Sequence, residues 1–274
     1  MIKCGITGAS GVLGSRVIKT LPFKFYIFKK DIRNKNDVEN WVFKKNFDIL
    51  IHLAAIVPIN TVNKNYKISY DVNLNGTKNL INALIKKKKK PEWFFYASTS
   101  HVYKTSSKYL RISETNKASP QNIYGQTKVL AEKFIIKKLK NSKIKFCIGR
   151  IFSFTDKKQK IPFVIPNIIK KIKSTKKNIN FKNLNHYRDF LNIKDIIAAI
   201  NILRLRKKNG LFNIASGKAF NLKNIALLIA DKYKKKINFI DDNDPTYLIG
   251  KIDKLKKLGW KPSKFRNNLD YFYQ

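Results

Sequence analysis

The chain has 274 residues, of which 43% are hydrophobic, and Leu, Ile, Phe and Val are spread along its whole length. This composition excludes an intrinsically disordered chain and is sufficient for one large domain or two lobes around a buried core. No run approaches the roughly 18 apolar residues of a membrane span, and the first residues enter a strand-like run without a charged leader, so we expect a cytoplasmic protein.

The charge balance is strongly basic. There are 58 Lys and Arg against 17 Asp and Glu, which gives a formal net charge of +41. Such a value is typical of proteins that bind nucleic acid or anionic membranes. However, 50 of the 58 basic residues are Lys, and they occur in nearly every predicted helix and loop rather than in one segment. We therefore interpret the lysines as solvated faces and do not expect a nucleic acid or a membrane as partner.

Strand-like apolar runs alternate with amphipathic stretches in the first half of the chain. Five runs are predicted to be strands: residues 2–7, 23–28, 47–55, 92–98 and 143–151. The alternation predicts an α/β fold, a Rossmann-type doubly wound parallel sheet with helices on both faces. Cys4 and Cys147 fall inside the first and the last of these runs, so packing explains them better than a disulfide or a metal site does. We expect no metal.

A glycine-rich segment, GITGASGVLGSR at residues 5–16, follows the first predicted strand. Gly8, Gly11 and Gly14 lack side chains, so the backbone can turn tightly and approach a ligand, and the N–H groups of the helix that follows attract phosphate. The segment fits the pyrophosphate of a dinucleotide. Its spacing is TGxxGxxG rather than GxGxxG, and the alternative is a tight strand-to-helix turn without a ligand.

The pattern loosens after about residue 152, where two or three helices and a few short strands are predicted. We interpret this part as a smaller α/β lobe interleaved with the first domain. The expected division assigns residues 1–152 and about 186–215 to a dinucleotide-binding domain, and about 153–185 and 216–274 to a substrate-binding lobe. The run Lys86–Lys90 is interpreted as cations at a helix end, because they complement the helix dipole and Pro91 stops the helix.

The TGxxGxxG segment resembles the short-chain dehydrogenase/reductase superfamily, specifically its extended branch, which acts on nucleotide-linked sugars. Five further segments are similar to that branch and occur in its order: HLAA (52–55), VNLNGTKNL (72–80), STSHVY (98–103), YGQTK (124–128) and RDFLNIKD (188–195). The resemblance spans residues 2 to about 260. The order of the segments is far more specific than any one of them.

The resemblance implies NAD(P) as cofactor. The positions that match the cofactor-binding ones are Gly8, Ser10, Gly11, Val12, Leu13, Gly14, Asp31, Ile32, Leu53, Ala54, Ala55, Asn73, Tyr124 and Lys128. The second strand is followed by Lys29 and Lys30, where NAD-specific folds place an acid for the adenosine ribose. This favours NADP(H) weakly. By resemblance, Asp31 is expected to contact adenine.

A Tyr followed four residues later by Lys occurs three times in the chain. With 12 Tyr and so many Lys, about two such pairs arise by chance, and we interpret Tyr26/Lys30 and Tyr247/Lys251 as accidents. Tyr124/Lys128 lies early in a predicted helix, which brings positions i and i+4 together. It also follows Thr99 by 25 residues, a separation similar to that of the family.

Thr99, Tyr124 and Lys128 are the candidate catalytic residues. Hydride transfer at a sugar carbon requires a proton to move at its oxygen, and Tyr124 is the candidate acid/base. The pKa of a free Tyr is about 10, so Lys128 and the nicotinamide would have to stabilise a phenolate. By resemblance Lys128 also holds the nicotinamide ribose, and Thr99 orients the substrate oxygen, with Ser98 or Ser100 as substitutes. The alternative is a half-buried Tyr on an amphipathic helix.

Ser100, His101 and Arg188 are the candidate substrate-binding residues. The planar guanidinium of Arg188 matches the oxygens of a substrate diphosphate. Its alternative role is an ion pair with Asp189 or Asp195. His101 is either a second proton donor or a polar residue at a strand end, and we favour the second. One departure from the family pattern is Ser153, which stands where the family has Asn.

The expected partner is a nucleotide-diphosphate sugar. A homodimer is compatible with the sequence. Dehydratases of the branch carry Asp-Glu directly after the active-site Thr, but this chain has Ser100 and His101, which argues against dehydration. The short segment after the second strand resembles 4-keto-sugar reductases, so we favour reduction of a 4-keto-6-deoxysugar nucleotide over 4-epimerisation with retained NAD. A non-catalytic cofactor sensor or nucleic-acid binder remains as an alternative that need not keep Thr99, Tyr124 and Lys128.

Overall fold

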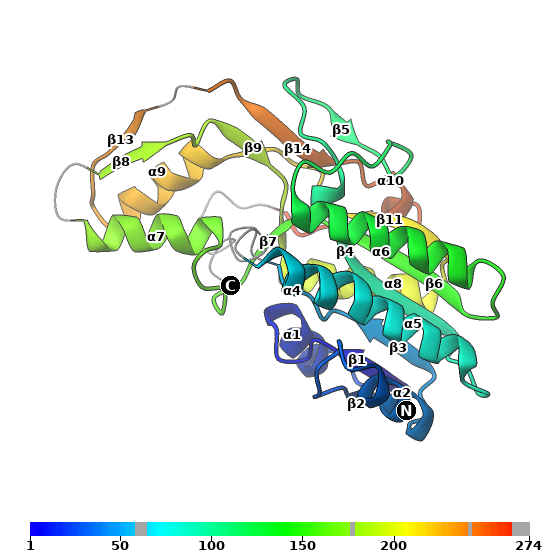
Figure 1. Ribbon diagram of the computed structural model, residues 1–274. Coiled ribbons are helices and arrows are strands. Elements are labelled where there is room, and N and C mark those ends of the chain that lie inside the picture. The colour runs from blue at the N-terminus through cyan, green and yellow to red at the C-terminus, as the bar shows by residue number, and fades with distance from the viewer. Residues whose placement is uncertain (58–64, 176–178, 241–242, 265–274) are drawn as a thin grey trace.

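A six-stranded, entirely parallel sheet forms the centre of the computed structural model, which describes residues 1–57, 65–175, 179–240 and 243–264 (Figure 1). The strand order is β11-β6-β4-β3-β1-β2. The strands are β1 (Lys3–Thr7), β2 (Lys24–Ile27), β3 (Ile49–His52), β4 (Trp93–Thr99), β6 (Lys145–Ile151) and β11 (Gly210–Ile214). The five strands predicted from the apolar runs are confirmed, and so is the Rossmann-type fold class.

The order of the strands reverses between β1 and β3. Because β1 has β2 on one side and β3 on the other, the connections leave the sheet in opposite directions at this point. Ligands of open α/β sheets bind in the crevice at the carboxyl ends of the strands beside such a switch point. The glycine segment after β1 and the HLAA segment after β3 both lie at this edge.

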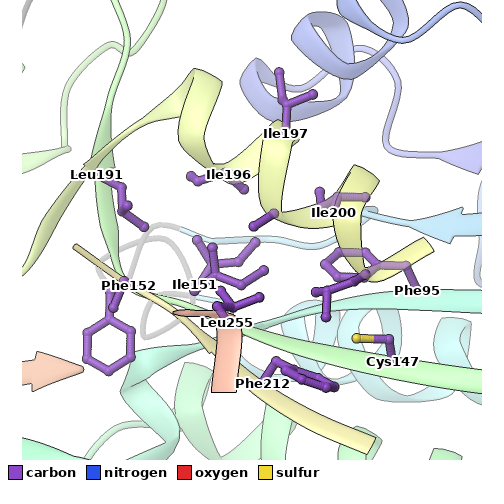
Figure 2. Close-up of a cluster of buried hydrophobic side chains, with 14 of the residues drawn as sticks. Phe95, Cys147, Ile151, Phe152, Leu191, Ile196, Ile197, Ile200, Phe212 and Leu255 are labelled. Atoms are coloured by element: carbon purple, nitrogen blue, oxygen red, sulfur yellow. The ribbon is translucent and has the colours of Figure 1, made fainter. Parts of the chain in front are cut away.

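Helices cover both faces of the sheet. The helices of this part are α1 (Val12–Thr20), α2 (Lys35–Lys44), α4 (Tyr66–Tyr70), α5 (Gly76–Lys86), α6 (Ile123–Leu139) and α8 (Ile193–Leu205). Helix α2 packs against α5, which packs against α6, whereas α1 packs against α8. Two apolar cores result, one beneath α2, α5 and α6 and a larger one beneath α1 and α8. In Figure 2, Ile200 of α8 lies over Phe95 of the sheet, whereas Ile197 points to the other side of the helix.

A second group of elements lies beyond the carboxyl edge of the sheet (Figure 1). It comprises α7 (Val164–Ser174), α9 (Leu222–Lys232), β8 (Ile179–Lys182), β9 (His186–Arg188), β12 (Phe220–Asn221), β13 (Ile237–Ile240) and β14 (Thr246–Gly250). Helices α7 and α9 share a third apolar core with β8 and β12. The remaining elements are η1 (Asp71–Asn75), η2 (Ser100–Val102), β5 (Arg111–Ile112), β7 (Ser153–Thr155), β10 (Phe190–Asn192) and α10 (Asp253–Lys256).

The chain passes between the two groups more than once. Strand β11 belongs to the central sheet, and helix α8 packs against that sheet. Strand β9, at the start of the stretch 186–215, pairs instead with β12 and β14. Strand β14 in turn pairs with β5, which comes from the first half of the chain. The division into a dinucleotide-binding domain and a substrate-binding lobe stays a prediction, and residues 265–274 of the expected lobe lie outside the described residues.

One lysine of the run Lys86–Lys90 has a structural role. Helix α5 ends at Lys86, as the helix-end interpretation requires. The next residue, Lys87, is buried, and its Nζ donates to the carbonyl oxygens of Val42 (2.8 Å) and Phe43 (3.4 Å). These carbonyls belong to the last turn of α2, whose dipole a cation complements. Lys87 therefore fastens α5 to the end of α2.

Cys4 and Cys147 lie in β1 and β6, where both are buried and unpaired. Burial raises the pKa of each thiol. The described residues contain no group of three or more His, Cys, Asp or Glu side chains placed to hold a metal ion. Within the same ranges, none of the helices is both long and apolar enough to span a bilayer.

Candidate functional site

The glycines of the first loop allow three backbone segments to meet. Gly8 follows β1 with φ of +73°, and a Cβ there would lie 2.6 Å from the backbone nitrogen of Ala54, in the loop after β3. A Cβ on Gly14 would overlap the carbonyl oxygen of Gly8. Gly11 is the N-cap of α1, and no side chain caps the helix there. The first N–H groups of α1, beginning at Val12, are therefore available to an anion at the switch point.

A buried histidine joins these loops. Thr77 Oγ1 donates to the carbonyl oxygen of Asn73 (2.8 Å), so it accepts from His52 Nε2 (2.9 Å), and His52 Nδ1 accepts from Thr7 Oγ1 (2.6 Å). Burial lowers the pKa of His52 to about 3, so the ring is neutral. The chain of hydrogen bonds holds the ends of β1 and β3 against helix α5. Sequence reasoning included His52 only as part of HLAA and did not predict this role.

Asn73 lies in η1, a π-helical turn at the start of α5. Its Oδ1 accepts from the backbone nitrogen of Ile56 (2.8 Å), and its Nδ2 donates to the carbonyl oxygen of Ile56 (3.0 Å) and to Thr127 Oγ1 (3.3 Å). The side chain thus ties the loop that contains Leu53, Ala54 and Ala55 to helix α6. This placement indicates that Asn73 supports the loop after β3.

The segment after β2 is cationic and exposed. Lys29, Lys30 and Asp31 are all exposed, and Arg33 donates to the Asp31 carboxylate through Nη2 (2.6 Å) and Nε. The hydrogen bonds from Arg33 hold the pKa of Asp31 below its ordinary value. Ile32 is buried against Gly76, where a Cβ would collide with it. Sequence reasoning missed Arg33, although its spacing from Asp31 was visible.

The structure brings together the three candidate catalytic side chains. Thr99 ends β4, and its side chain lies close enough to Tyr124, the second residue of α6, to lower the pKa of that phenol. Lys128 Nζ lies 5.9 Å from the ring centroid of Tyr124 and donates to the carbonyl oxygen of Ala97 (2.9 Å). Gly125 makes this approach feasible, because a Cβ there would overlap the carbonyl oxygen of His101 in η2.

Burial sets the charge state of this cluster. It raises the pKa of Tyr124 to about 12, against the hydrogen bond to Thr99, which lowers it. It lowers the pKa of Lys128 to about 7, and the nearby Glu132 opposes this shift. Tyr124 is therefore a neutral phenol near pH 7, in the form that can donate a proton.

The structure corrects one alternative for the hydroxyl residue. Ser98 points toward α6, where its Oγ donates to Glu132 (2.5 Å) and is buried. Adjacent residues of a strand direct their side chains to opposite faces, so Ser98 does not share the position of Thr99. Ser98 as a substitute for Thr99 is therefore wrong. Ser100 is also buried and opens the short helix η2.

His101 lies against the candidate catalytic tyrosine. Its ring centroid is 6.0 Å from that of Tyr124 in an edge-on arrangement, and its Nδ1 lies 3.3 Å from Nδ2 of Asn122. The amide Nδ2 is a donor, so Nδ1 accepts and the proton of the neutral ring is on Nε2. Burial lowers the pKa of His101 to about 4, with the charge of Arg188 adding to the effect. His101 thus lies against Tyr124 and within range of the charge of Arg188.

Asn122 is a functional residue that sequence reasoning missed. Its Oδ1 accepts from the backbone nitrogen of Gly125 (2.8 Å), which makes it the N-cap of α6, while its Nδ2 orients His101. The signal was present, because Asn directly before a predicted helix is a preferred N-cap. The same side chain therefore begins the helix that carries Tyr124 and holds its neighbour.

Arg188, at the end of β9, makes no ion pair in the part of the chain that the structure describes. Its guanidinium donates to the carbonyl oxygens of Tyr187 and Thr246 (both 2.9 Å) and to Thr246 Oγ1 (3.1 Å). Asp189 instead accepts from Ser216, Gly217 and Gly250, and Asp195 accepts from Ser263. An ion pair of Arg188 with either carboxylate is therefore wrong. Burial lowers the pKa of Arg188 to about 10, so it stays cationic near pH 7.

A cavity of about 500 Å³ lies away from this cluster, between the turn after β7 and helix α7. It is lined by Asp156, Lys157, Gln159, Ile165, Pro166, Ile169, Lys170, Lys173 and Ser174. None of the candidate catalytic or substrate residues lines it. Ser153, the departure from the family pattern, is half-buried in β7, where it pairs with Phe190 of β10.

Comparison with known proteins identifies relatives over most of the chain. It is 28% identical over 299 residues to dTDP-D-glucose 4,6-dehydratase of Dictyostelium discoideum, covering 90% of this chain and 68% of that protein. It is 26% identical over 269 residues to GDP-6-deoxy-D-talose 4-dehydrogenase of Aggregatibacter actinomycetemcomitans, covering 93% of this chain and 90% of that protein. UDP-glucose 4-epimerases also match.

Solved structures share the fold. The structure of RMD from Pseudomonas aeruginosa complexed with NADPH superimposes with a TM-score of 0.87 at 22% identity, covering 97% of this chain and 95% of that one. The sequence profile of the GDP-mannose 4,6 dehydratase family matches residues 12–269. With the Rossmann-type sheet, the TGxxGxxG loop and the Tyr124/Lys128 helix in their places, the chain belongs to the GDP-mannose 4,6 dehydratase family of extended short-chain dehydrogenases/reductases.

Proposed function

We propose that this protein is a NAD(P)-dependent oxidoreductase that reduces a nucleotide-linked 4-keto-6-deoxysugar. The observation that carries the proposal is the proximity of Thr99 to Tyr124, with Lys128 one turn further along the helix and the charge of Arg188 within range of His101. A proton donor, a cation beside it and a cation for a diphosphate are the groups that carbonyl reduction of a sugar nucleotide needs.

The residues at the switch point fit a dinucleotide. Gly8, Gly11 and Gly14 would hold the pyrophosphate against the first N–H groups of α1, together with Ser10, Val12 and Leu13. Leu53, Ala54 and Ala55 would line the nicotinamide side, and Asp31 and Ile32 the adenosine side. When bound in reduced form, the nicotinamide supplies the hydride that adds to the carbonyl carbon.

The exposed lysines after β2 support NADP(H) as the form used. Lys29, Lys30 and Arg33 would lie near the adenosine ribose of a bound cofactor, where a 2′-phosphate would meet cations rather than a free carboxylate. Asp31 is already paired with Arg33, so it is a poor partner for ribose hydroxyls. The fold relative from Pseudomonas aeruginosa was solved with NADPH.

Tyr124 would supply the proton. Its phenolic proton would go to the carbonyl oxygen while the carbonyl carbon receives the hydride, so the ketone would become an alcohol and Tyr124 a phenolate. Thr99, in contact with Tyr124, would hold the same oxygen by a hydrogen bond, and the ammonium of Lys128 would stabilise the phenolate. A neutral phenol with a pKa of about 12 suits a donor better than a base.

Arg188 and His101 would bind the substrate. Among the described residues the guanidinium has backbone and hydroxyl acceptors but no carboxylate, so its charge would be available to a diphosphate. His101 offers Nε2–H as a neutral donor to a sugar hydroxyl beside Tyr124, and Ser100 lies next to it. Dehydration is not favoured, because the Asp-Glu pair that such enzymes carry after the Thr is replaced by Ser100 and His101.

The second candidate function is 4-epimerisation of a nucleotide hexose, since UDP-glucose 4-epimerases are among the proteins that match. The two reactions differ in cofactor use. A reductase consumes one reduced cofactor for each product, whereas an epimerase returns the hydride to the same sugar.

The absorbance of reduced nicotinamide tests the proposal. We expect the purified protein to carry little dinucleotide and to oxidise added NADPH or NADH when a nucleotide-linked 4-keto-6-deoxysugar is supplied. Stoichiometrically bound NAD, together with interconversion of UDP-hexoses at constant absorbance, would replace the reductase by the epimerase. No turnover with either substrate class, despite cofactor binding, would favour the non-catalytic alternative.

A further inference from the structure

A buried ion pair lies directly behind the candidate catalytic residues. Arg150 on β6 donates to both carboxylate oxygens of Glu132 on α6, through Nε (3.1 Å to Oε1) and Nη2 (2.7 Å to Oε2). Ser98 on β4 donates to the same carboxylate at 2.5 Å. Ser98 and Arg150 are opposite each other on adjacent strands, so both reach Glu132 from one face of the sheet. All three residues are buried: Glu132 is 3% exposed, and Ser98 and Arg150 are each 4% exposed.

The network continues away from the site through Tyr103 to Asn213, and each of its polar side chains has a hydrogen-bond partner. Arg150 Nη1 donates to Tyr103 Oη (2.8 Å), which donates to Asn213 Oδ1 (2.8 Å). Asn213 Nδ2 donates to the carbonyl oxygen of Ile112 (2.8 Å). The far end of the network is thus fastened to β11 and β5. A network satisfied in this way has a single geometry.

The near end of the network faces the candidate catalytic groups. Tyr124, Lys128 and Glu132 are spaced by four residues, so they occupy one face of α6. On β4, Ser98 stands between Ala97, whose carbonyl oxygen accepts from Lys128, and Thr99, whose side chain lies beside Tyr124. Helix and strand therefore meet at three successive strand positions, and the middle contact is the hydrogen bond from Ser98 to Glu132.

A buried ion pair is a poor choice for stability alone. The cost of removing both charges from water roughly cancels their attraction, and apolar side chains of similar volume often stabilise a fold as well or better. What the pair provides here is a fixed distance between α6 and the end of β4.

Glu132 is also the one carboxylate with an electrostatic effect on Lys128 among the described residues. The other groups around Lys128 Nζ are the ring of Tyr96 at 4.7 Å, the ring of Tyr124 and the carbonyl of Ala97. His52, from β3, is neutral. Glu132, whose carboxylate is also bonded to Arg150, therefore supplies the negative counter-charge of Lys128.

We infer that Glu132 is a positioning residue: held by Arg150, it ties helix α6 to the end of β4 through Ser98 and so fixes Lys128 and Thr99 relative to Tyr124. The inference rests on the proposed function in taking Lys128 as the residue that holds the nicotinamide ribose. It adds two residues to the site: Glu132 provides a negative charge near Lys128, and Ser98 fixes the position of β4 relative to α6.

The test measures the dissociation constant of NADPH by fluorescence between about pH 5 and pH 9, a range that spans the titration of Lys128 before and after the expected downward shift. Binding to the unchanged protein should weaken as Lys128 loses its proton. In Glu132→Gln the midpoint of this loss should move to lower pH by about one unit or more, because the counter-charge is gone. Glu92→Gln removes an exposed carboxylate with the same change of net charge, and its midpoint should not move.

Ser98→Ala separates geometry from charge. It keeps the ion pair, so the midpoint should stay, but turnover should fall by about tenfold because Thr99 and Lys128 are less well fixed. If Glu132→Gln does not fold, the double variant Glu132→Gln/Arg150→Met leaves no unpaired charge and should show the same downward shift.

The inference is overturned if the midpoint of the folded Glu132 variant coincides with that of the unchanged protein, or if Ser98→Ala turns over at the native rate. Lys128→Met distinguishes this from failure of the proposed function. If that variant keeps the pH dependence of binding, Lys128 is not the group that titrates, and the role assigned to it in the proposed function fails instead.

Discussion

Arg16 on α1 and Asp156 after β7 form an ion pair, with 2.7 Å between Nε and Oδ2, that joins the first helix of the nucleotide fold to the segment leading into α7. The Asp156 side chain is fully buried, whereas that of Arg16 is partly exposed. These residues are 140 positions apart in sequence. The pair is therefore a link between the start of the chain and the second group of elements.

Removing Arg16 should destabilise the protein markedly, because Asp156 would be left as an unpaired buried carboxylate. We expect Arg16→Ala to lower the free energy of unfolding by about 3 kcal/mol. Lys207→Ala, which breaks the exposed pair with Glu92, should change it by less than about 1 kcal/mol. Urea unfolding followed by circular dichroism measures both, and equal effects of the two variants would contradict the link.

Replacement of Tyr124 by Phe tests the proton donor. Turnover should fall by about 10²-fold or more, since the proton no longer has a donor, while the dissociation constant of the cofactor changes little. Tyr26→Phe is the matched control, because Tyr26 has a Lys at the same spacing but lies in β2. Near-native turnover of Tyr124→Phe would remove this residue from the mechanism.

Two glycines of the same loop should respond differently to Ala. A Cβ on Gly14 overlaps the Gly8 carbonyl, so Gly14→Ala should lose both stability and cofactor binding. A Cβ on Gly11 meets only the Gly8 carbonyl oxygen, at 3.3 Å, so Gly11→Ala should stay folded and lose mainly cofactor affinity. Thermal unfolding and a cofactor titration separate the effects. Full NADPH affinity of Gly11→Ala would argue against a pyrophosphate at this loop.

The lowered pKa of Lys128 predicts how stability varies with pH. The group binds a proton up to about pH 7 in the folded chain, and up to about pH 10.4 when unfolded. Between these values the unfolded chain binds more protons, so folding gains stability as pH rises and loses it toward pH 7. Relative to Lys128→Met, the unfolding free energy should therefore rise by at most about 1.4 kcal/mol per pH unit above pH 7. A pH-independent difference between the two proteins in urea would show that Lys128 is not buried as described.

Cofactor choice depends on the cations after β2. The variant Lys29→Ala/Lys30→Ala should weaken NADPH binding by about tenfold or more, the scale of a lost hydrogen bond to a charged group, and leave NADH binding nearly unchanged. Lys44→Ala/Lys45→Ala makes the same change of net charge at the end of α2 and serves as the control. Tighter binding of NADH than NADPH by the unchanged protein would overturn the preference itself.

The amino-acid sequence by itself determined the central sheet and the identity of the main motifs. Apolar runs such as 92–98 and 143–151 are long and bounded, and burial on both faces of a parallel sheet demands such runs. The glycines at 8, 11 and 14 and the Tyr124/Lys128 spacing depend on local backbone geometry, which is encoded within a few residues. For this reason they were recognisable without any knowledge of the tertiary structure.

The tertiary structure alone decided which distant polar groups meet. Whether Ser98 or Thr99 faces Tyr124 depends on the face of β4, and whether Arg188 pairs with Asp189 depends on the donors that Ser216 and Gly250 bring to that carboxylate. The Ser98, Glu132 and Arg150 network likewise joins three elements. A single sequence carries periodicity along the chain, but contacts across strands and helices arise only when packing sets their register, and this is why these partners could not be predicted.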